Sequence, residues 1–351
     1  MSVETFIQAM PKVDLHVQLE GAVSRDLLLM IAEQNDLAST YKKRKQYDDW
    51  VALLREPEPK QIDEILLEAA GWVRHPEDIA RVVYDYGVQL AKQNVKYAEV
   101  AVNAAIYTDL GLTFQQVLEA LNDGADRLQR GWKVRMNWLL SMPRERPRKS
   151  DDISRWATSV TAQKGNVVGL SLIGRESDQP IAQFRKAFVT AAKKDLARVT
   201  HVYSEPDSDS FATVMEQVQP TRVTDAWGLI EDDEAIEYLK EHDIPVLLAP
   251  MREIFLSRID SLTDYPLRQL LDKGVTVILS SQMPEIYGAT LTDVLIRAVQ
   301  ESGITVDEVQ QMMLDAVRYS LLESEDKKAM LEDFEQQLAA LREEHLSGEM
   351  E

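Results

Sequence analysis

Side chains that can transfer protons near neutral pH occur directly after several short apolar stretches of this sequence. His16 follows the first such stretch, and Glu205 and Asp225 follow two later ones. Imidazole and carboxylate groups are common general acids and bases. If Glu205 and Asp225 lie together, their pKa values should separate, so that one could act as an acid and the other as a base. Alternatively, pairing with Arg175 or Arg252 would hold both carboxylates ionised and inert.

Arginines form a second group with potential chemistry. Arg144, Arg146, Arg175 and Arg252 each follow an apolar stretch, although the chain has 59 acidic and only 39 basic residues. Guanidinium groups bind phosphate and carboxylate through paired hydrogen bonds, which suggests an anion-binding site. The alternative is an ion-pair network, because buried charges need partners. The acidic residues available to such a network are Glu176, Glu205, Asp225 and Glu253.

The elements that must position these residues alternate between strands and helices. Short apolar, β-branched runs are separated by amphipathic helical patterns, which is typical of a parallel α/β fold. The predicted strands are residues 13–17, 95–102, 133–140, 167–172, 197–203, 222–225, 245–248 and 275–279. Eight such units predict a (β/α)8 TIM barrel, whose active sites lie at the carboxyl ends of the strands.

Two predicted helical segments are additional to the eight strand–helix units of the barrel. Residues from about 24 to 93 should form a helical cap after strand 1, with Ser24 as one N-cap and Pro76 in the first turn of another helix. The segment from about 304 to 351 is rich in Glu and Lys and is predicted to be a helical C-terminal appendage. We expect residues 1–351 to form a single barrel domain with these additions.

The composition excludes several classes of partner. A net charge of -20 disfavours nucleic acid, whose binding depends on cationic side chains. No stretch approaches the roughly 20 apolar residues of a membrane span, and no secretory signal opens the chain. Cysteine is absent, which predicts a cytoplasmic location and excludes disulfides. The oligomeric state is not predicted by these features.

Several motifs resemble those of the adenosine deaminase family, in the same order along the chain. PKVDLHVQLEG at residues 11–21 is similar to the family's P-K-x-E-L-H-x-H-L-D/E-G. VYSE stands where the family has H-A-G-E, TRVTDAWG where it has R-I-G-H-G, and LAPMRE where it has C-P-T/L-S-N. SSQMPEIYGATLTDV resembles the family's N-T/S-D-D-P-x-x-F-G-x-x-L-x-x-E. The resemblance extends from about residue 5 to about residue 335 and implies the family's barrel fold.

The resemblance also implies a zinc site, which this sequence does not preserve. The family holds one zinc with three His and one Asp, and only His16 remains at those positions. Gln18, Val202 and Gln282 stand at the other three. A catalytic zinc needs about three His or carboxylate ligands, so we expect neither a bound metal nor another cofactor. Without ligand partners, His16 is most simply a barrel-interior residue hydrogen-bonded to Glu205 or Asp225, although a remnant ligand or a general base are alternatives.

The remaining family positions are partly kept. Gly174 and the acid–base Glu205 are present, whereas Asp225 replaces the family's catalytic His and Met283 replaces the Asp that contacts the purine. Natural divergence and deliberate remodelling would both explain these replacements.

His201 precedes the family's ligand position by one residue. Strand alternation would place His201 on the same face as Tyr203 and Glu205. However, the family's ligand and its Glu are three residues apart across the strand end, so we expect His201 to point toward the surrounding helices. Tyr203 and Trp227 either stack on a planar ligand or fill space at the barrel mouth.

Three hypotheses for function follow, and whether the chain is an enzyme stays open among them. The first is a catalytically silent or ligand-binding homologue without the family's zinc-dependent purine deamination. The second is a metal-free acid–base enzyme that uses Glu205, Asp225 and His16. The third is a deaminase that retains hydrolytic activity on a purine-like or anionic substrate. The expected partner is a small molecule at the barrel mouth, with an anion as one alternative. The predicted substrate-binding residues are Gly174, Gln18, Arg175, Tyr203, Trp227, Arg252, Gln282 and Met283.

Overall fold

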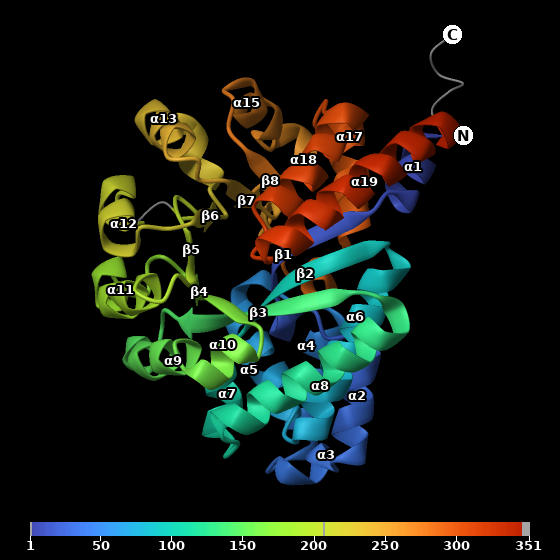
Figure 1. Cartoon of the computed structure of the whole chain (residues 1–351). Helices are drawn as coiled ribbons and strands as arrows, with labels where there is room; N and C mark the ends of the chain where they lie inside the picture. Colours follow the sequence, from blue (N-terminus) through green and yellow to red (C-terminus); the bar gives the residue numbers. More distant parts are fainter. Residues whose placement is uncertain (1, 206–207, 346–351) are drawn as a thin grey trace.

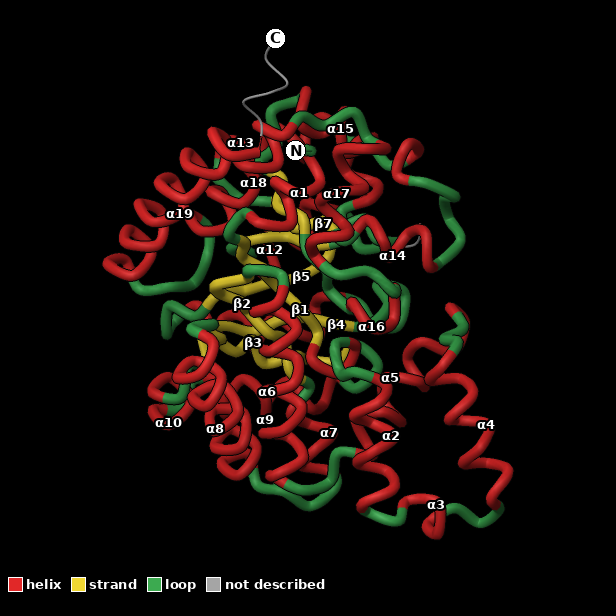
Figure 2. The backbone as a smooth tube through the Cα atoms, turned by 90° about the vertical axis from the view of Figure 1, so that its right-hand side faces the viewer, coloured by secondary structure: helices red, strands yellow, loops and turns green. Residues whose placement is uncertain are grey.

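Eight parallel strands form a barrel in a computed structural model that describes residues 2–205 and 208–345. They are β1 (Lys12–Gln18), β2 (Val95–Val102), β3 (Arg135–Pro143), β4 (Val167–Ile173), β5 (Ala197–His201), β6 (Arg222–Thr224), β7 (Val246–Leu248) and β8 (Val277–Leu279). Neighbouring strands pair in chain order from β1 to β8. Helices surround the strands (Figures 1 and 2), so the predicted (β/α)8 fold is confirmed.

Residues with left-handed backbone explain where several strand boundaries differ from the prediction. β3 begins at Arg135 because Lys133, with φ of 62°, caps the C-terminus of the preceding helix. β5 ends at His201, and Tyr203 has a φ of 55°. β6 ends at Thr224, and Asp225 has a φ of 52°. Such φ values are incompatible with a regular strand, and apolar patterning cannot predict them.

The helices before β5 are α1 (Val3–Ala9), α2 (Arg25–Gln34), α3 (Leu37–Thr40), α4 (Arg44–Arg55), α5 (Ile62–Trp72), α6 (Pro76–Lys92), α7 (Ala104–Asp109), α8 (Phe114–Trp132), α9 (Ser150–Ala157), α10 (Val160–Lys164) and α11 (Arg185–Ala192). Those after β5 are α12 (Phe211–Val218), α13 (Asp233–Glu241), α14 (Pro250–Phe255), α15 (Leu267–Asp272), α16 (Pro284–Tyr287), α17 (Leu291–Glu301), α18 (Val306–Arg318) and α19 (Ser324–His345). Short 3₁₀ turns lie at Leu19–Gly21, Pro59–Gln61, Pro147–Lys149, Ile181–Phe184, Trp227–Glu231 and Leu262–Asp264.

Helices α2 to α6 occupy the segment for which a cap was predicted, and α2 to α5 project to one side of the barrel (Figure 2). The Ser24 hydroxyl accepts a hydrogen bond from the Leu27 N–H, as expected of an N-cap, and Pro76 is the first residue of α6. Helices α18 and α19 follow from Val306. The predicted appendage extends to residue 351, of which residues 346–351 lie outside the described chain. The single-domain division stays a prediction.

The barrel interior combines a thin apolar layer with buried charge. Ala101, Leu139 and Val199 form a cluster of their own, separate from the large core between strands and helices. Beside it, Arg222 Nη1 lies 2.8 Å from Glu99 Oε2, and both side chains are almost completely buried. This ion pair links β6 to β2 inside the barrel, below the carboxyl ends of the strands.

The seam between β8 and β1 is held differently from the other strand contacts. In the described chain, ladder pairing joins each strand to the next but does not join β8 to β1. Instead, the Gln18 N–H donates to the Gln282 carbonyl at 2.8 Å. The buried Asp14 carboxylate also accepts hydrogen bonds from the hydroxyls of Ser280 and Ser281. Side chains thus replace part of the ladder where the first and last strands meet.

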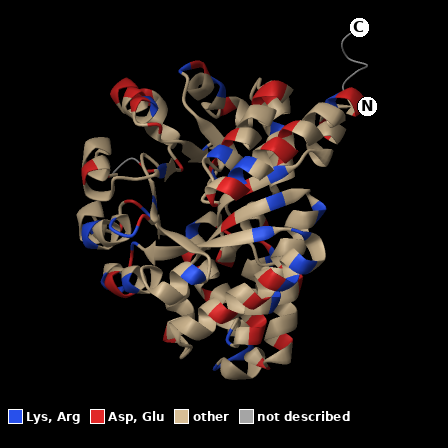
Figure 3. Cartoon of the chain, viewed as in Figure 1, with Lys and Arg blue, Asp and Glu red and all other residues tan. Residues whose placement is uncertain are grey.

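Charged residues of both signs are distributed over the outer helices (Figure 3). Within residues 2–205 and 208–345, no helix is both long and apolar enough to cross a membrane.

Candidate active site

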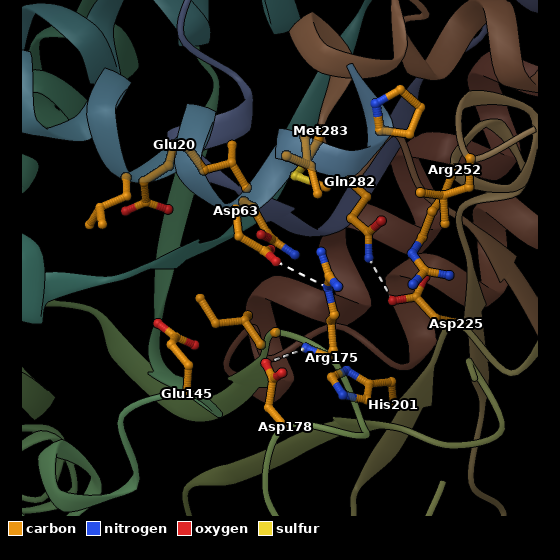
Figure 4. A pocket seen from close by; sticks show the side chains of 18 of the residues that line it. Glu20, Asp63, Glu145, Arg175, Asp178, His201, Asp225, Arg252, Gln282 and Met283 are labelled. Atoms are coloured by element: carbon orange, nitrogen blue, oxygen red, sulfur yellow. Dashed lines mark hydrogen bonds and ion pairs between the residues drawn. The ribbon is translucent and has the colours of Figure 1, made fainter. Parts of the chain in front are cut away.

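A cavity of about 730 Å³ opens where the carboxyl ends of the strands meet (Figure 4). This volume lies within the usual range for small-molecule sites. Most of the residues singled out from the sequence line it, namely His16, Gln18, Gly174, Arg175, Glu205, Asp225, Arg252, Gln282 and Met283.

Tyr203 and Trp227 are not part of this lining. The Tyr203 hydroxyl donates to Asp232 at 2.6 Å, and its ring stacks on Phe211. Trp227 packs against Tyr265. Both aromatic rings therefore contact neighbouring elements of the barrel wall, which agrees with the space-filling alternative for them.

His201 lines the cavity, so the expectation that it points toward the helices is wrong. In β5 it lies two residues after Val199, which belongs to the barrel-interior cluster, and it shares that face. Val202, by contrast, packs in the core between strands and helices. The alternation of side chains between the two faces of β5 continues to its last residue, His201. The expectation was wrong because it placed the end of this alternation before His201. Burial and the positive charges of Arg144 and Arg252 lower the pKa of His201 well below its usual value.

His16 occupies an irregular position in β1. Its φ is 66°, and the register between β1 and β2 shifts between Leu15 and Val17, which leaves His16 as a bulge. The His16 Nε2 lies 2.5 Å from the Ser171 hydroxyl. The expected hydrogen bond to Glu205 or Asp225 is therefore wrong, because the bulge directs the ring toward β4. Burial, followed by the charge of Arg222, lowers the pKa of His16 to about 3, so the ring is neutral.

Asp225 is buried at the end of β6 and faces an amide and a guanidinium. Its Oδ2 accepts a hydrogen bond from the Gln282 Nε2 at 2.8 Å, and the Gln282 Oε1 accepts one from the Tyr287 hydroxyl at 3.0 Å. Burial raises the pKa of Asp225, while the charge of Arg252 and the Gln282 hydrogen bond oppose that rise. Figure 4 shows the Arg252 guanidinium next to the Asp225 carboxylate.

Glu205 lies elsewhere on the cavity wall. Its Oε2 accepts hydrogen bonds from the N–H and the hydroxyl of Ser177, at 3.2 and 3.0 Å. Among the described residues, no hydrogen bond joins Glu205 to Asp225. The predicted carboxylate pair is therefore replaced by two separately bonded carboxylates on one cavity.

Three of the four arginines singled out from the sequence line the cavity, and each pairs with a carboxylate. Arg146 pairs with Asp109, Arg175 Nε lies 3.2 Å from Asp63, and Arg252 Nη1 lies 2.6 Å from Glu253. These partners differ from the expected ones except for Glu253.

Arg144 does not line the cavity. The expectation that all four arginines contribute to one anion-binding site is therefore wrong. The Arg144 guanidinium is buried and donates to the carbonyls of Glu176 and Gln179. Its Nη1 also lies 3.6 Å from Asp209 Oδ2, so its partners lie outside the cavity lining.

Several residues with strained backbone lie at this mouth. His16, Tyr203, Asp225 and Gln282, none of them glycine, have φ values of 66°, 55°, 52° and 51°. Each such residue costs about 1–3 kcal/mol, and clusters of them are characteristic of functional sites. Tyr203, Asp225 and Gln282 turn the chain just after β5, β6 and β8, whereas His16 lies at the bulge within β1.

The residues at the zinc positions do not fit the ion that the family resemblance implies. Val202 is in the core, Gln282 is bonded to Asp225 and Tyr287, and His16 Nε2 is bonded to Ser171. Within the described chain, no three His, Cys, Asp or Glu side chains are grouped to hold a metal ion. Three such ligands are the minimum for a catalytic zinc.

Four further residues belong to the site although the sequence interpretation did not select them. Glu20 and Asn103 line the cavity, and the Asn103 N–H donates to the Glu20 carboxylate at 2.9 Å. Their positions directly after strands 1 and 2 could have identified them. Arg258, which also lines the cavity, and Ser171, which bonds His16, carry no comparable sequence signal.

Two solved structures illustrate the similarity in architecture. The adenine deaminase from Arthrobacter aurescens is 18% identical, with a TM-score of 0.83 over 94% of this chain and 100% of its own. Arabidopsis ADAL complexed with IMP is 19% identical, with a TM-score of 0.86 over 95% of this chain and 99% of its own. At this identity the likeness supports the fold.

A sequence relative, the adenine deaminase of Vibrio parahaemolyticus, is 24% identical over 344 residues, covering 95% of this chain and 98% of the relative. Relatives and structural neighbours that match nearly the whole chain are named as deaminases. They contradict the first hypothesis, a catalytically silent homologue, and favour the alternative of retained hydrolytic activity. The expectation of a silent homologue was wrong because it took the loss of ligand residues for the loss of chemistry.

The sequence model of the adenosine deaminase family matches residues 11–337. That span includes all eight strands and every cavity residue discussed above. The chain belongs to the adenosine deaminase family.

Proposed function

We propose that this protein is a hydrolytic deaminase acting on an amino-substituted, purine-like small molecule, with side chains at the barrel mouth making the proton transfers. The observation that carries the proposal is the convergence of His16, Glu205 and Asp225, from three strands, on one cavity with a strained rim. Family membership and deaminase-named relatives support the reaction type. A cytoplasmic location stays a prediction from the absence of cysteine.

The reaction replaces a ring amino group by oxygen. The water oxygen bonds to the ring carbon as electrons of the adjacent C=N bond move to the ring nitrogen, and the C–N bond to the amino group then breaks. One hydrogen of the water ends on the ring nitrogen and the other leaves in ammonia.

Asp225 is the proposed general base, which accepts a proton from the attacking water. Its carboxylate is buried, and one oxygen is fixed by Gln282 while the side chain lines the cavity. Burial raises the pKa of this carboxyl, which makes its ionised form a stronger base.

Glu205 is the proposed carrier of the proton to the ring nitrogen. Ser177 fixes one of its carboxylate oxygens through two hydrogen bonds. His16 is neutral and held by Ser171, so its proposed role is to orient water or the ring through a hydrogen bond.

An activity panel tests the proposal. Adenine, adenosine, AMP and N6-methyl-AMP are incubated with wild-type protein, and the amine and the oxo product are quantified by mass spectrometry. We expect turnover of at least one compound. Asp225→Asn and Glu205→Gln should each lower it by about 100-fold or more, the usual contribution of a general acid or base.

The two variants also serve as controls for a contaminating host deaminase, because they are purified in the same way. Equal rates in all three preparations, or no turnover of any compound by the wild type, would contradict the proposal.

Dialysis against a chelator tests the independence from zinc. Since the described residues do not fit the ion, the rate should be unchanged by chelator and by added zinc. A rate that falls on dialysis and returns with zinc would show that the donor set differs from the one described.

A further inference from the structure

Arg252 is the most enclosed of the arginines on the cavity wall for which an ion pair is seen. Its side chain is 17% exposed, compared with 30% for Arg258, 37% for Arg146 and 49% for Arg175. Arg252 lies at the start of α14, directly beyond β7. A positive charge at this depth interacts more strongly with a ligand than one at the rim, because less water screens it.

The neighbours of Arg252 fix its charge and leave part of its guanidinium available. Nη1 donates to Glu253 at 2.6 Å, and Arg258 Nη1 approaches the other oxygen of that carboxylate at 2.9 Å. Within the described chain, Nε and Nη2 of Arg252 make no hydrogen bond, and no ion pair within 4.0 Å joins Arg252 to Asp225. Both side chains line the cavity, and Figure 4 shows the guanidinium next to this carboxylate.

Asp225 and His201 line the same cavity as Arg252, and the charge of Arg252 affects the pKa of both side chains. The charge of Arg252 is the largest influence, after burial, on the pKa of Asp225, and it also helps to lower the pKa of His201. Arg252 therefore places a positive charge of the chain itself beside these two side chains.

We propose that Arg252 is a catalytic residue whose guanidinium binds the oxygen that water adds to the ring, supplying the positive charge that the family resemblance assigns to zinc. This inference rests on the proposed deaminase function. As a proton passes from the water to Asp225, negative charge builds up on the water oxygen before the new C–O bond passes that charge to the ring. A guanidinium stabilises it through charge-assisted hydrogen bonds, and it keeps its own protons throughout.

The same contact should persist in the product, which carries that oxygen as a carbonyl. Arg252 should therefore distinguish a 6-oxopurine from a purine with no substituent at that position. Binding gives a readout that does not depend on turnover.

The experiment compares hypoxanthine with unsubstituted purine by titration calorimetry, as free bases and as 5′-monophosphate nucleotides. In Arg252→Ala we expect the affinity for the 6-oxo compound to fall by about 10-fold or more, the scale of a hydrogen bond to a charged group. The affinity for the unsubstituted compound should change less than about 3-fold. Addition of guanidinium ion at millimolar concentration should restore part of the lost affinity, and part of any lost kcat.

Arg252→Gln is the second variant in case the alanine variant does not fold, because it keeps an amide donor for Glu253 but removes the charge. Arg268→Ala controls for the loss of an ion-paired arginine, since Arg268 pairs with Asp272 and Glu308 outside the cavity. It should leave both affinities unchanged.

The possible outcomes separate the two proposals. If Arg252→Ala weakens the binding of the 6-oxo and the unsubstituted compounds equally, or weakens the binding of neither, the proposed role of Arg252 is overturned even if the wild type is an active deaminase. Selective weakening in a protein that turns over no amino compound would keep Arg252 as an oxygen-binding residue and reject the deaminase function. Absence of wild-type binding to all four compounds would reject both.

Discussion

The carboxyl group of Glu20 lies on the cavity wall with 7% of the residue exposed. Burial raises its pKa from 4.5 to about 7, although the Asn103 N–H partly stabilises the anion. A carboxyl whose pKa is higher in the folded than in the unfolded chain stabilises the fold at low pH. That contribution is lost as pH rises from about 4.5 through about 7.

Glu20→Gln removes this ionisation and keeps an oxygen that can accept from Asn103. The free energy of unfolding of the variant, relative to wild type, should rise by about 2–3 kcal/mol between pH 5 and pH 8. Urea titrations of both proteins at the two pH values measure it. A difference that is independent of pH would show that Glu20 ionises in the fold as readily as in water.

At the residue scale, the sequence predicted the location of the site better than the contacts within it. Positions after the strands identified His16, Glu205 and Asp225 because barrel topology brings all strand ends to one mouth. The sequence could not predict the hydrogen bond between His16 and Ser171, because that contact depends on a bulge and a left-handed φ. The inward direction of His201 was available from strand alternation, but was discarded in favour of motif spacing.

At the scale of elements, α6 and α8 pack closely against one another. A Cβ on Gly124 of α8 would lie 2.5 Å from the Ala80 carbonyl oxygen and 2.8 Å from the Val83 Cβ. Real Cβ atoms do not approach a backbone atom so closely, so the two helices must separate to accept a side chain there.

Gly124→Ala should therefore destabilise the fold by about 1–3 kcal/mol, the usual cost of overpacking. Gly131→Ala in the same helix is the matched control, because a Cβ there meets nothing within 4 Å. It should be neutral or stabilising by up to about 1 kcal/mol, since alanine favours helix. Thermal unfolding of the two variants decides the matter, and equal melting temperatures would contradict close contact between α6 and α8.

Element types and order were predictable because hydrophobic periodicity differs between buried strands and surface helices. The predicted residues 95–102 coincide with β2, whose ladder with β3 is regular. Predictions failed at the ends of β5 and β6, where Tyr203 and Asp225 leave the strand with left-handed φ. Those conformations are imposed by tertiary packing and leave no trace in a local apolar pattern.

At the scale of the whole molecule, the net charge of -20 opposes the approach of any anionic ligand. Salt screens this repulsion, because the Debye length falls from about 30 Å at 0.01 M to about 8 Å at 0.15 M ionic strength. The association rate constant of IMP should therefore increase several-fold over this range, whereas that of neutral hypoxanthine should be constant. Stopped-flow binding measures both, and an IMP rate that falls with salt would show that the cavity arginines dominate the long-range field.

The seam between β1 and β8 has a consequence for motion. Elsewhere around the barrel, ladder pairing holds each strand to its neighbour, whereas this junction depends on one backbone hydrogen bond and the side chains around Asp14. Local opening should therefore begin here, and amide hydrogens of Gln18 and Ser281 should exchange with deuterium faster than those of Val100 and Leu140 within β2 and β3. Because His16 and Gln282 flank the same junction, each opening would also loosen the cavity wall. Local opening of the barrel would then occur next to the active site, while the rest of the barrel stays rigid.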